Sequence, residues 1–150
     1  MAAFKSILGR SVGVGAYGNL AAAGGDIDIT APCADATVTV GDEATNVRAI
    51  TIQLKDAKGN DINYSETVEI ILWADAAKAA FVATGGSTGI AIGTDGALLA
   101  VVAKKYFLAQ SETDGDIDLT WTDTGTEAAY IGVRLPTGRI VMGSQALTNA

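Results

Sequence analysis

The stretch from residue 48 to residue 60 constrains the fold of this chain most strongly. Alternate positions place these side chains on one face of an extended backbone: Arg48, Ile50, Ile52 and Leu54. The opposite face carries small or polar side chains, and the stretch ends in turn-forming residues that include Gly59. A helix would scatter the apolar positions around its surface, so the pattern predicts a half-buried β-strand followed by a solvent-exposed turn.

The same alternation recurs along the rest of the chain. It predicts strands over residues 36–40, 48–55, 67–73, 98–108, 116–122, 129–135 and 139–142. The first of these strands is expected to end at Gly41–Asp42, and residues 98–108 are expected to form one long strand region. About seven strands separated by short turns predict an all-β fold, an immunoglobulin-like antiparallel β-sandwich.

One window favours a helix. Residues 75–81 combine alanine and lysine after Asp75, which can cap a helix N-terminus. We expect one or two helical turns within a loop, because so short a helix is not stable alone.

Residues 1–34 differ from the remainder, being rich in glycine and alanine without a sustained period. We expect an extended N-terminal arm over residues 1–34 and a sandwich domain over 35–150. Lys5 and Arg10 before an apolar stretch loosely resemble a secretion signal, but glycines interrupt that stretch, and we read it as part of the mature chain. The segments 25–30 and 115–120 have nearly the same sequence, which suggests two strands with the same pattern.

Composition excludes several classes of function. The 150 residues fit one domain, and 27 of the apolar residues are alanine, so valine, isoleucine and leucine must form most of the core. The net charge of −7 argues against binding to nucleic acids or to anionic membranes. Histidine is absent, which removes the usual general base and zinc ligand. Cys33 is the single cysteine; we expect a buried thiol, with a reactive or intermolecular thiol as the alternative.

Asp114, Asp116 and Asp118 form the best metal-binding candidate, since alternating carboxylates are hard oxygen ligands. The glycine and glutamate of a calcium-binding loop are missing, so a solvated acidic strand face is the preferred interpretation, with calcium as the alternative.

Other groupings give weaker signals. Gly13, Gly15 and Gly18 match a nucleotide-loop spacing without its expected strand and helix. Glu66, Glu69 and Asp75 are read as surface charge rather than a glycosidase pair. The aromatic residues are read as core or contact residues rather than a sugar-stacking surface: Tyr64, Trp73, Tyr106, Trp121 and Tyr130. No cofactor or catalytic residue is predicted.

Several ordered motifs carry a resemblance to a known group. They are residues 47–62, Gly93-Thr-Asp-Gly-Ala-Leu-Leu99, Lys105-Tyr-Phe-Leu108, Ser111-Glu-Thr-Asp-Gly-Asp-Ile-Asp118 and Val133-Arg-Leu-Pro-Thr-Gly-Arg139. Over residues 46–148 the chain resembles small phage and prophage virion proteins with immunoglobulin-like domains, found as capsid decoration, cement or tail-associated proteins. The resemblance implies no binding residues.

The resemblance, with the missing catalytic residues, leads to a functional hypothesis. We expect a non-enzymatic protein on the capsid surface of the virion, made in the host cytoplasm, whose partners are the major capsid protein and copies of itself in a trimer. The predicted contact residues are Phe4, Ile7, Leu8, Tyr17 and Leu20 in the arm and Ile71 and Trp73 on an outer strand face. The alternatives are a tail-associated module that binds host glycans or surface protein and, less favoured, an enzyme.

Overall fold

The computed structural model describes residues 4–5, 11–12, 20–22, 25–27 and 32–149. The chain divides into two compact units, Met1–Pro32 and Cys33–Ala150. In the first unit, β1 (Phe4–Lys5) pairs antiparallel with β2 (Ser11–Val12), and β3 (Leu20–Ala22) pairs antiparallel with β4 (Gly25–Ile27). The two similar segments noted in the sequence thus both contain strand residues, in β4 and in β11 of the second unit.

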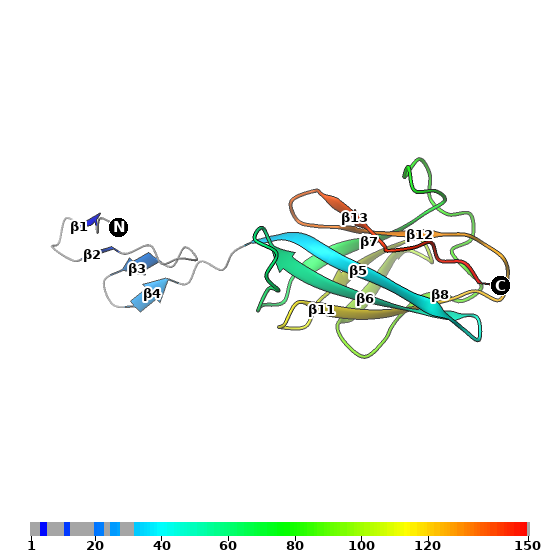
Figure 1. The fold of residues 1–150 in the computed structure, drawn as a ribbon, viewed down its shortest axis with the longest axis horizontal. Helices are drawn as coiled ribbons and strands as arrows, with labels where there is room; N and C mark the ends of the chain where they lie inside the picture. The colour runs from blue at the N-terminus through cyan, green and yellow to red at the C-terminus, as the bar shows by residue number, and fades with distance from the viewer. Residues whose placement is uncertain (1–3, 6–10, 13–19, 23–24, 28–31, 150) are drawn as a thin grey trace. The chain divides into compact units, whose positions relative to one another are not determined.

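The second unit is a sandwich of two antiparallel sheets, which confirms the predicted all-β fold (Figure 1). The four-stranded sheet has the order β5-β6-β11-β8, formed by β5 (Cys33–Ala44), β6 (Val47–Asp56), β11 (Asp116–Thr122) and β8 (Gly89–Ile92). The five-stranded sheet has the order β13-β12-β7-β10-β9, formed by β13 (Ile140–Met142), β12 (Tyr130–Arg134), β7 (Thr67–Trp73), β10 (Tyr106–Gln110) and β9 (Ala97–Val102). Nine strands replace the seven expected.

The core lies between the two sheets, where alternate side chains of each inner face meet. Its largest fully buried side chains are Trp121, Ile50, Ile52, Leu54, Ile70, Leu72, Ile117, Leu119, Ile131, Leu147, Val68 and Val82. The predicted inner face of β6 is confirmed, because Ile50, Ile52 and Leu54 are all at most 1% exposed. Strand β7 has the bounds that its alternation predicted, residues 67–73.

The first sandwich strand does not end at Gly41–Asp42, as the sequence suggested. β5 continues to Ala44 through a β-bulge, because Val40 pairs with Ile50 whereas Glu43 pairs with Arg48. The actual turn is the two-residue loop at 45–46, where both residues have positive φ, 53° and 65°. Such a turn matches the twist of a hairpin, so turn geometry rather than the glycine sets the strand end.

The long strand predicted over residues 98–108 is also wrong. The structure has two strands there, β9 and β10, joined by a tight turn at Ala103–Lys105. Lys104 takes a φ of 61°, and the Lys105 amide donates to the Val102 carbonyl at 3.0 Å. The two lysines therefore mark a hairpin turn within an otherwise apolar run.

The helix predicted over residues 75–81 is absent, and these residues form a turn instead. The Lys78 amide donates to the Asp75 carbonyl at 3.2 Å, and Lys78 has a φ of 61°. The returning chain brings Phe81 opposite Trp73, where their rings stack at 5.7 Å between centroids. This aromatic contact outweighs the weak helix propensity of the alanines.

A polar loop packs on the buried Trp121 and fixes the end of the sandwich. The indole Nε1 of Trp121 donates to the Gly85 carbonyl at 3.1 Å. The Glu127 carboxylate accepts hydrogen bonds from the amides of Thr84 and Gly86. Although burial of Glu127 opposes its ionisation, a hydrogen bond from the Thr84 hydroxyl and those from the amides lower the pKa of its carboxyl.

Candidate functional site

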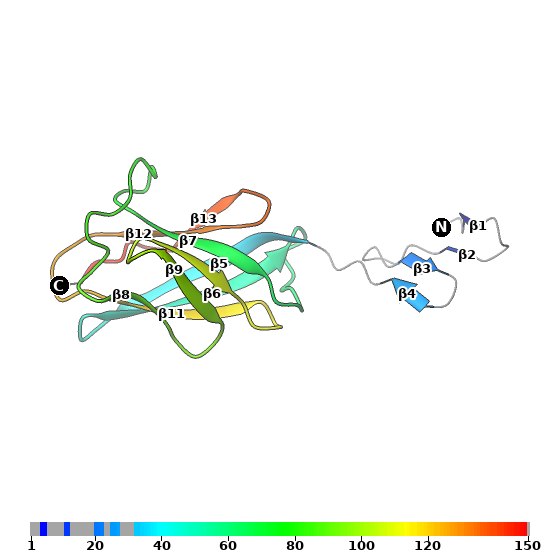
Figure 2. The same ribbon diagram turned by 180° about the vertical axis from the view of Figure 1, so that it is seen from behind.

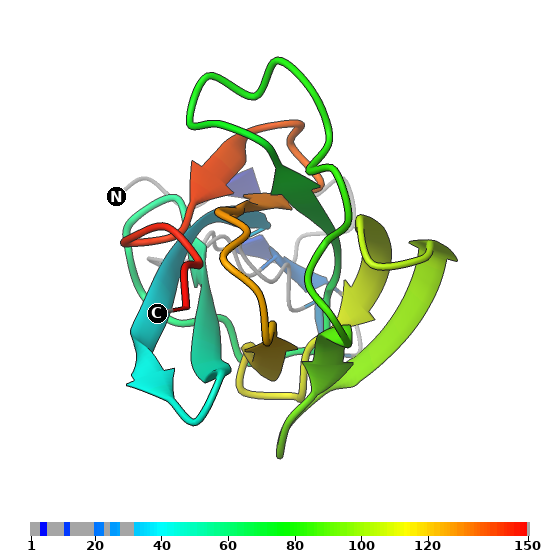
Figure 3. The same cartoon turned by 90° about the vertical axis from the view of Figure 1, so that its right-hand side faces the viewer.

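The strand β9 presents the most unusual surface of the sandwich. It is the last strand of the five-stranded sheet and pairs with β10 alone among the described strands. Leu99, Val101 and Val102 are 63%, 50% and 44% exposed. Figure 3 shows the β9–β10 hairpin, in yellow-green, at one side of the two sheets. This surface, formed by Leu99, Val101 and Val102, is called here the β9 edge.

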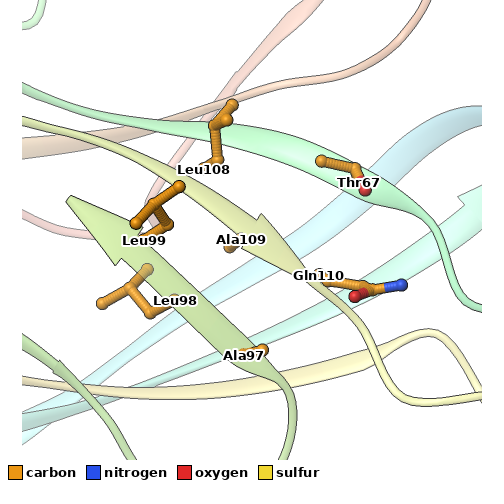
Figure 4. A pocket seen from close by; sticks show the side chains of 7 residues that line it. All are labelled: Thr67, Ala97, Leu98, Leu99, Leu108, Ala109 and Gln110. Carbon is orange, nitrogen blue, oxygen red and sulfur yellow. The ribbon is translucent and has the colours of Figure 1, made fainter. Parts of the chain in front are cut away.

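A shallow depression continues the β9 edge onto the sheet. Its volume is about 230 Å³, and its lining residues are Thr67, Ala97, Leu98, Leu99, Leu108, Ala109 and Gln110. Figure 4 shows the side chains of Leu99 and Leu108 near one another on neighbouring strands, in agreement with their pairing in the β9–β10 register. The lining is mostly aliphatic and holds no ionisable side chain, so it suits an apolar contact rather than acid–base chemistry.

On the opposite side of the sandwich, the edge strand is covered rather than open. There the edge strand β5 is covered by residues that follow β13 (Figures 1 and 2). The Ser144 amide donates to the Val38 carbonyl at 2.9 Å, and the Ser144 hydroxyl accepts from the Val40 amide at 2.9 Å. The Gln145 side chain donates to the Val40 carbonyl at 2.9 Å. Since unpaired strand edges recruit other strands, this cover protects β5, whereas β9 has no equivalent within residues 32–149.

The predicted contact residues fall into two groups. Phe4 lies in β1 and Leu20 in β3, whereas Ile7, Leu8 and Tyr17 lie outside the described residues. Ile71 and Trp73 are on the outer face of β7, as their alternation predicted. Ile71 is only 7% exposed, and Trp73 is half-buried under the exposed ring of Phe81. Their role in binding remains a prediction.

The other aromatic residues do not form one surface. Trp121 is fully buried in the core, and Tyr64 is partly buried and packs against the core cluster. Tyr106 and Tyr130 are half-buried on the outer face, opposite Ile71 and Trp73 respectively. The set named from the sequence is therefore split between the core and one face.

The acidic residues of the metal candidate extend along β11 and the turn before it. The Asp118 carboxylate accepts from the Thr94 hydroxyl at 2.6 Å, and the Asp114 carboxylate accepts from the Asp116 amide at 3.3 Å. Among the described residues, no group of three or more acidic or cysteine side chains is arranged to hold a metal ion. Burial and then the charges of Asp118, Asp114 and Asp95 raise the pKa of the Asp116 carboxyl.

Removal of the Asp116 carboxylate is expected to stabilise the protein at neutral pH. The fold raises the pKa of the Asp116 carboxyl, so the folded protein disfavours its ionised form. Ionisation of Asp116 therefore destabilises the protein at pH values above the ordinary pKa of aspartate, and this cost disappears at lower pH. We therefore expect Asp116→Asn to raise the melting temperature at about pH 7 and to leave it unchanged at about pH 3. Thermal unfolding with Asp42→Asn, which removes one charge at an exposed site, is the matched control. An equal gain in both variants would contradict the local explanation.

The remaining candidates are placed as follows. Glu69 forms an ion pair with Arg134 at 3.0 Å, and the Glu66 carboxylate accepts from the adjacent Thr67 amide. The Asp75 carboxylate accepts from the Ala79 amide at 3.4 Å, so these three carboxylates serve separate contacts. Gly13, Gly15 and Gly18 lie outside the described residues. Cys33 is buried, as expected, and burial and then the charge of Glu66 raise the pKa of its thiol.

Apolar exposure, rather than a catalytic grouping, distinguishes the sandwich surface. The described residues contain no helix with the length and apolar character needed to cross a membrane. The sequence did not identify the β9 edge, because a run that is apolar on both faces is also typical of a buried central strand. Its two lysines were the available signal, since a charged pair within such a run indicates a turn.

Comparison with known proteins found a structural likeness but no sequence relative. No protein-family model matches the chain, and no curated protein sequence matches it. Among solved structures, the chain is similar to a cohesin module from Clostridium perfringens ATCC13124 family 33 glycoside hydrolase, with 16% identity and a TM-score of 0.41. The match covers 78% of this chain and 96% of the module.

Proposed function

We propose that the protein is a non-enzymatic structural component of a phage virion that binds the outer surface of the capsid as a decoration or cement protein. The proposal rests on the motifs that resemble small virion proteins and on one structural observation. Among the described residues, those that form the sandwich core all lie between Cys33 and Leu147, within the second unit. The N-terminal arm is then the part of the chain assigned to attachment.

The resembling motifs supply the scaffold in this proposal. Residues 93–99 form the turn into β9, and residues 111–118 form the turn into β11. Residues 133–139 form the end of β12 and the turn that leads into β13. The arm and the outer face near Trp73 would contact capsid subunits, and many weak contacts repeated over a symmetric shell would give a high total affinity.

Removal of the arm tests this assignment. We expect a variant lacking residues 2–31 to keep the circular dichroism spectrum of a β-sandwich, because the core residues remain. We expect the same variant to stay in the supernatant when mixed with capsids assembled from the major capsid protein of the same genome, while the full chain sediments with them. Cosedimentation of the truncated variant at the level of the full chain would refute the role of the arm.

A tail-associated module that binds host glycans is the second candidate function. The favouring observation is the Trp73–Phe81 stack, in which the Phe81 ring is 49% exposed. Exposed aromatic rings suit stacking against sugars. Binding of the full chain to a glycan array, with loss of that binding in Phe81→Ala, would favour this candidate over capsid decoration.

A further inference from the structure

We infer that β9 pairs antiparallel with β9 of a second copy of this chain, so that two five-stranded sheets join edge to edge. The inference concerns the isolated protein in solution and is independent of the proposed function. It follows from three features of the β9 edge: its unpaired backbone, its apolar side chains and the opposite charges at its two ends.

The backbone of β9 is open to pairing along its outer side. It is the last strand of its sheet, and its sequence, Ala-Leu-Leu-Ala-Val-Val, contains no proline and no charged residue. Edge strands that avoid association usually carry such residues or lie under a loop, as β5 does here. A bulge near Val102 bends the end of β9, which leaves Ala97–Ala100 in regular register with β10. That segment is the part able to accept a new strand.

The side chains of β9 also favour a second copy as the occupant. Leu99, Val101 and Val102 are exposed on a protein whose net charge is −7, and the depression beside Leu99 extends the apolar area. In a symmetric pair, the same apolar side chains of the two copies would meet and lose contact with water. The apolar area would thus be buried without a second kind of partner.

The charges at the ends of β9 select the direction of pairing. Asp95 precedes the strand, whereas Lys104 and Lys105 follow it. Antiparallel pairing of two copies places Asp95 of each copy near the lysine turn of the other. Parallel pairing would bring like charges together at both ends, which is unfavourable. The charge pattern is therefore complementary to itself in the antiparallel direction alone.

This contact has two-fold symmetry and so differs from the trimer expected in the functional hypothesis. Two antiparallel edge strands are related by a two-fold axis, and each uses the same surface, so the contact closes at two copies. A trimer would need a different surface of the chain.

The mass of the full-length protein in solution tests the contact. We expect sedimentation velocity to find a dimer, and Leu99→Lys to weaken dimerisation at least about a hundredfold by placing a charge on the paired edge. Thr51→Lys, which adds the same charge to the exposed face of β6, is the control and should remain dimeric. A monomeric wild type at high concentration, or an oligomer unaffected by Leu99→Lys, would overturn the inference.

Charge reversal tests the antiparallel direction. Lys104 already donates to the carbonyls of Gly86 and Ser87, so Lys105 is the lysine to reverse. We expect Asp95→Lys and Lys105→Asp each to weaken self-association about tenfold, and an equimolar mixture of the two variants to form a heterodimer as strong as the wild type. Unchanged thermal unfolding of each variant would establish that the fold is kept. Failure of the mixture to recover association would refute antiparallel pairing.

Discussion

Replacing Trp121 with alanine is expected to lower the free energy of unfolding by about 3–5 kcal/mol, the usual range for truncating a large buried aromatic side chain. Trp121 has no exposed surface, and its strand β11 pairs with β6 on one side and with β8 on the other. The substitution would leave a cavity in the core beside the 84–87 loop. It would also leave the Gly85 carbonyl without the indole donor that holds it at 3.1 Å.

Denaturant unfolding followed by circular dichroism measures this loss without relying on tryptophan fluorescence. Trp121→Phe is the informative companion, because it keeps an aromatic ring and removes the N–H donor; we expect a smaller loss of about 1–3 kcal/mol. A loss below about 1 kcal/mol for Trp121→Ala would mean that the indole does not support the core as described.

The second large effect is expected at Gly85, where the chain approaches another backbone segment closely. Its φ is +83°, and a Cβ atom there would lie 2.0 Å from the Lys104 carbonyl oxygen. Gly85→Ala must therefore move either the 84–87 loop or the turn between β9 and β10. We expect a loss of at least about 3 kcal/mol, since the strained φ costs about 1–2 kcal/mol and the clash adds to it.

Gly59→Ala separates these two contributions. Gly59 has nearly the same φ, +85°, but nothing lies within 4 Å of the position of its Cβ. In the same denaturant titration, we expect Gly59→Ala to lower the free energy of unfolding by only the conformational cost of the positive φ, about 1–2 kcal/mol. Equal losses for the two variants would contradict the close approach of Gly85 to Lys104.

Some of the strands could be predicted from the sequence because one face of each is buried and the other faces solvent, which produces an alternation of apolar and polar residues. β6, β7 and β11 all show this alternation, and their inner side chains are the ones that the pattern selected. The prediction fails where that contrast disappears. In residues 97–110 both faces are apolar, so periodicity locates neither the turn at Lys104 nor the outermost position of β9 in its sheet.

The candidate site depends on information that a single sequence does not carry locally. Leu99 is exposed because β9 is an edge strand, and the order of strands in a sheet follows from pairing between distant segments. Ile71 illustrates the reverse case. It lies on the outer face that the alternation predicted, but its neighbours bury it to 7% exposure. The Phe81–Trp73 stack likewise replaces a helix that local propensity favoured.

The location of the protein on the intact particle tests the central claim most directly. Electron cryomicroscopy of virions from the wild type and from a mutant lacking this chain would give a difference map of its position. The proposed function predicts difference density repeated at symmetry-related sites over the outer surface of the head. Density confined to the tail, or no density on the particle at all, would contradict capsid decoration.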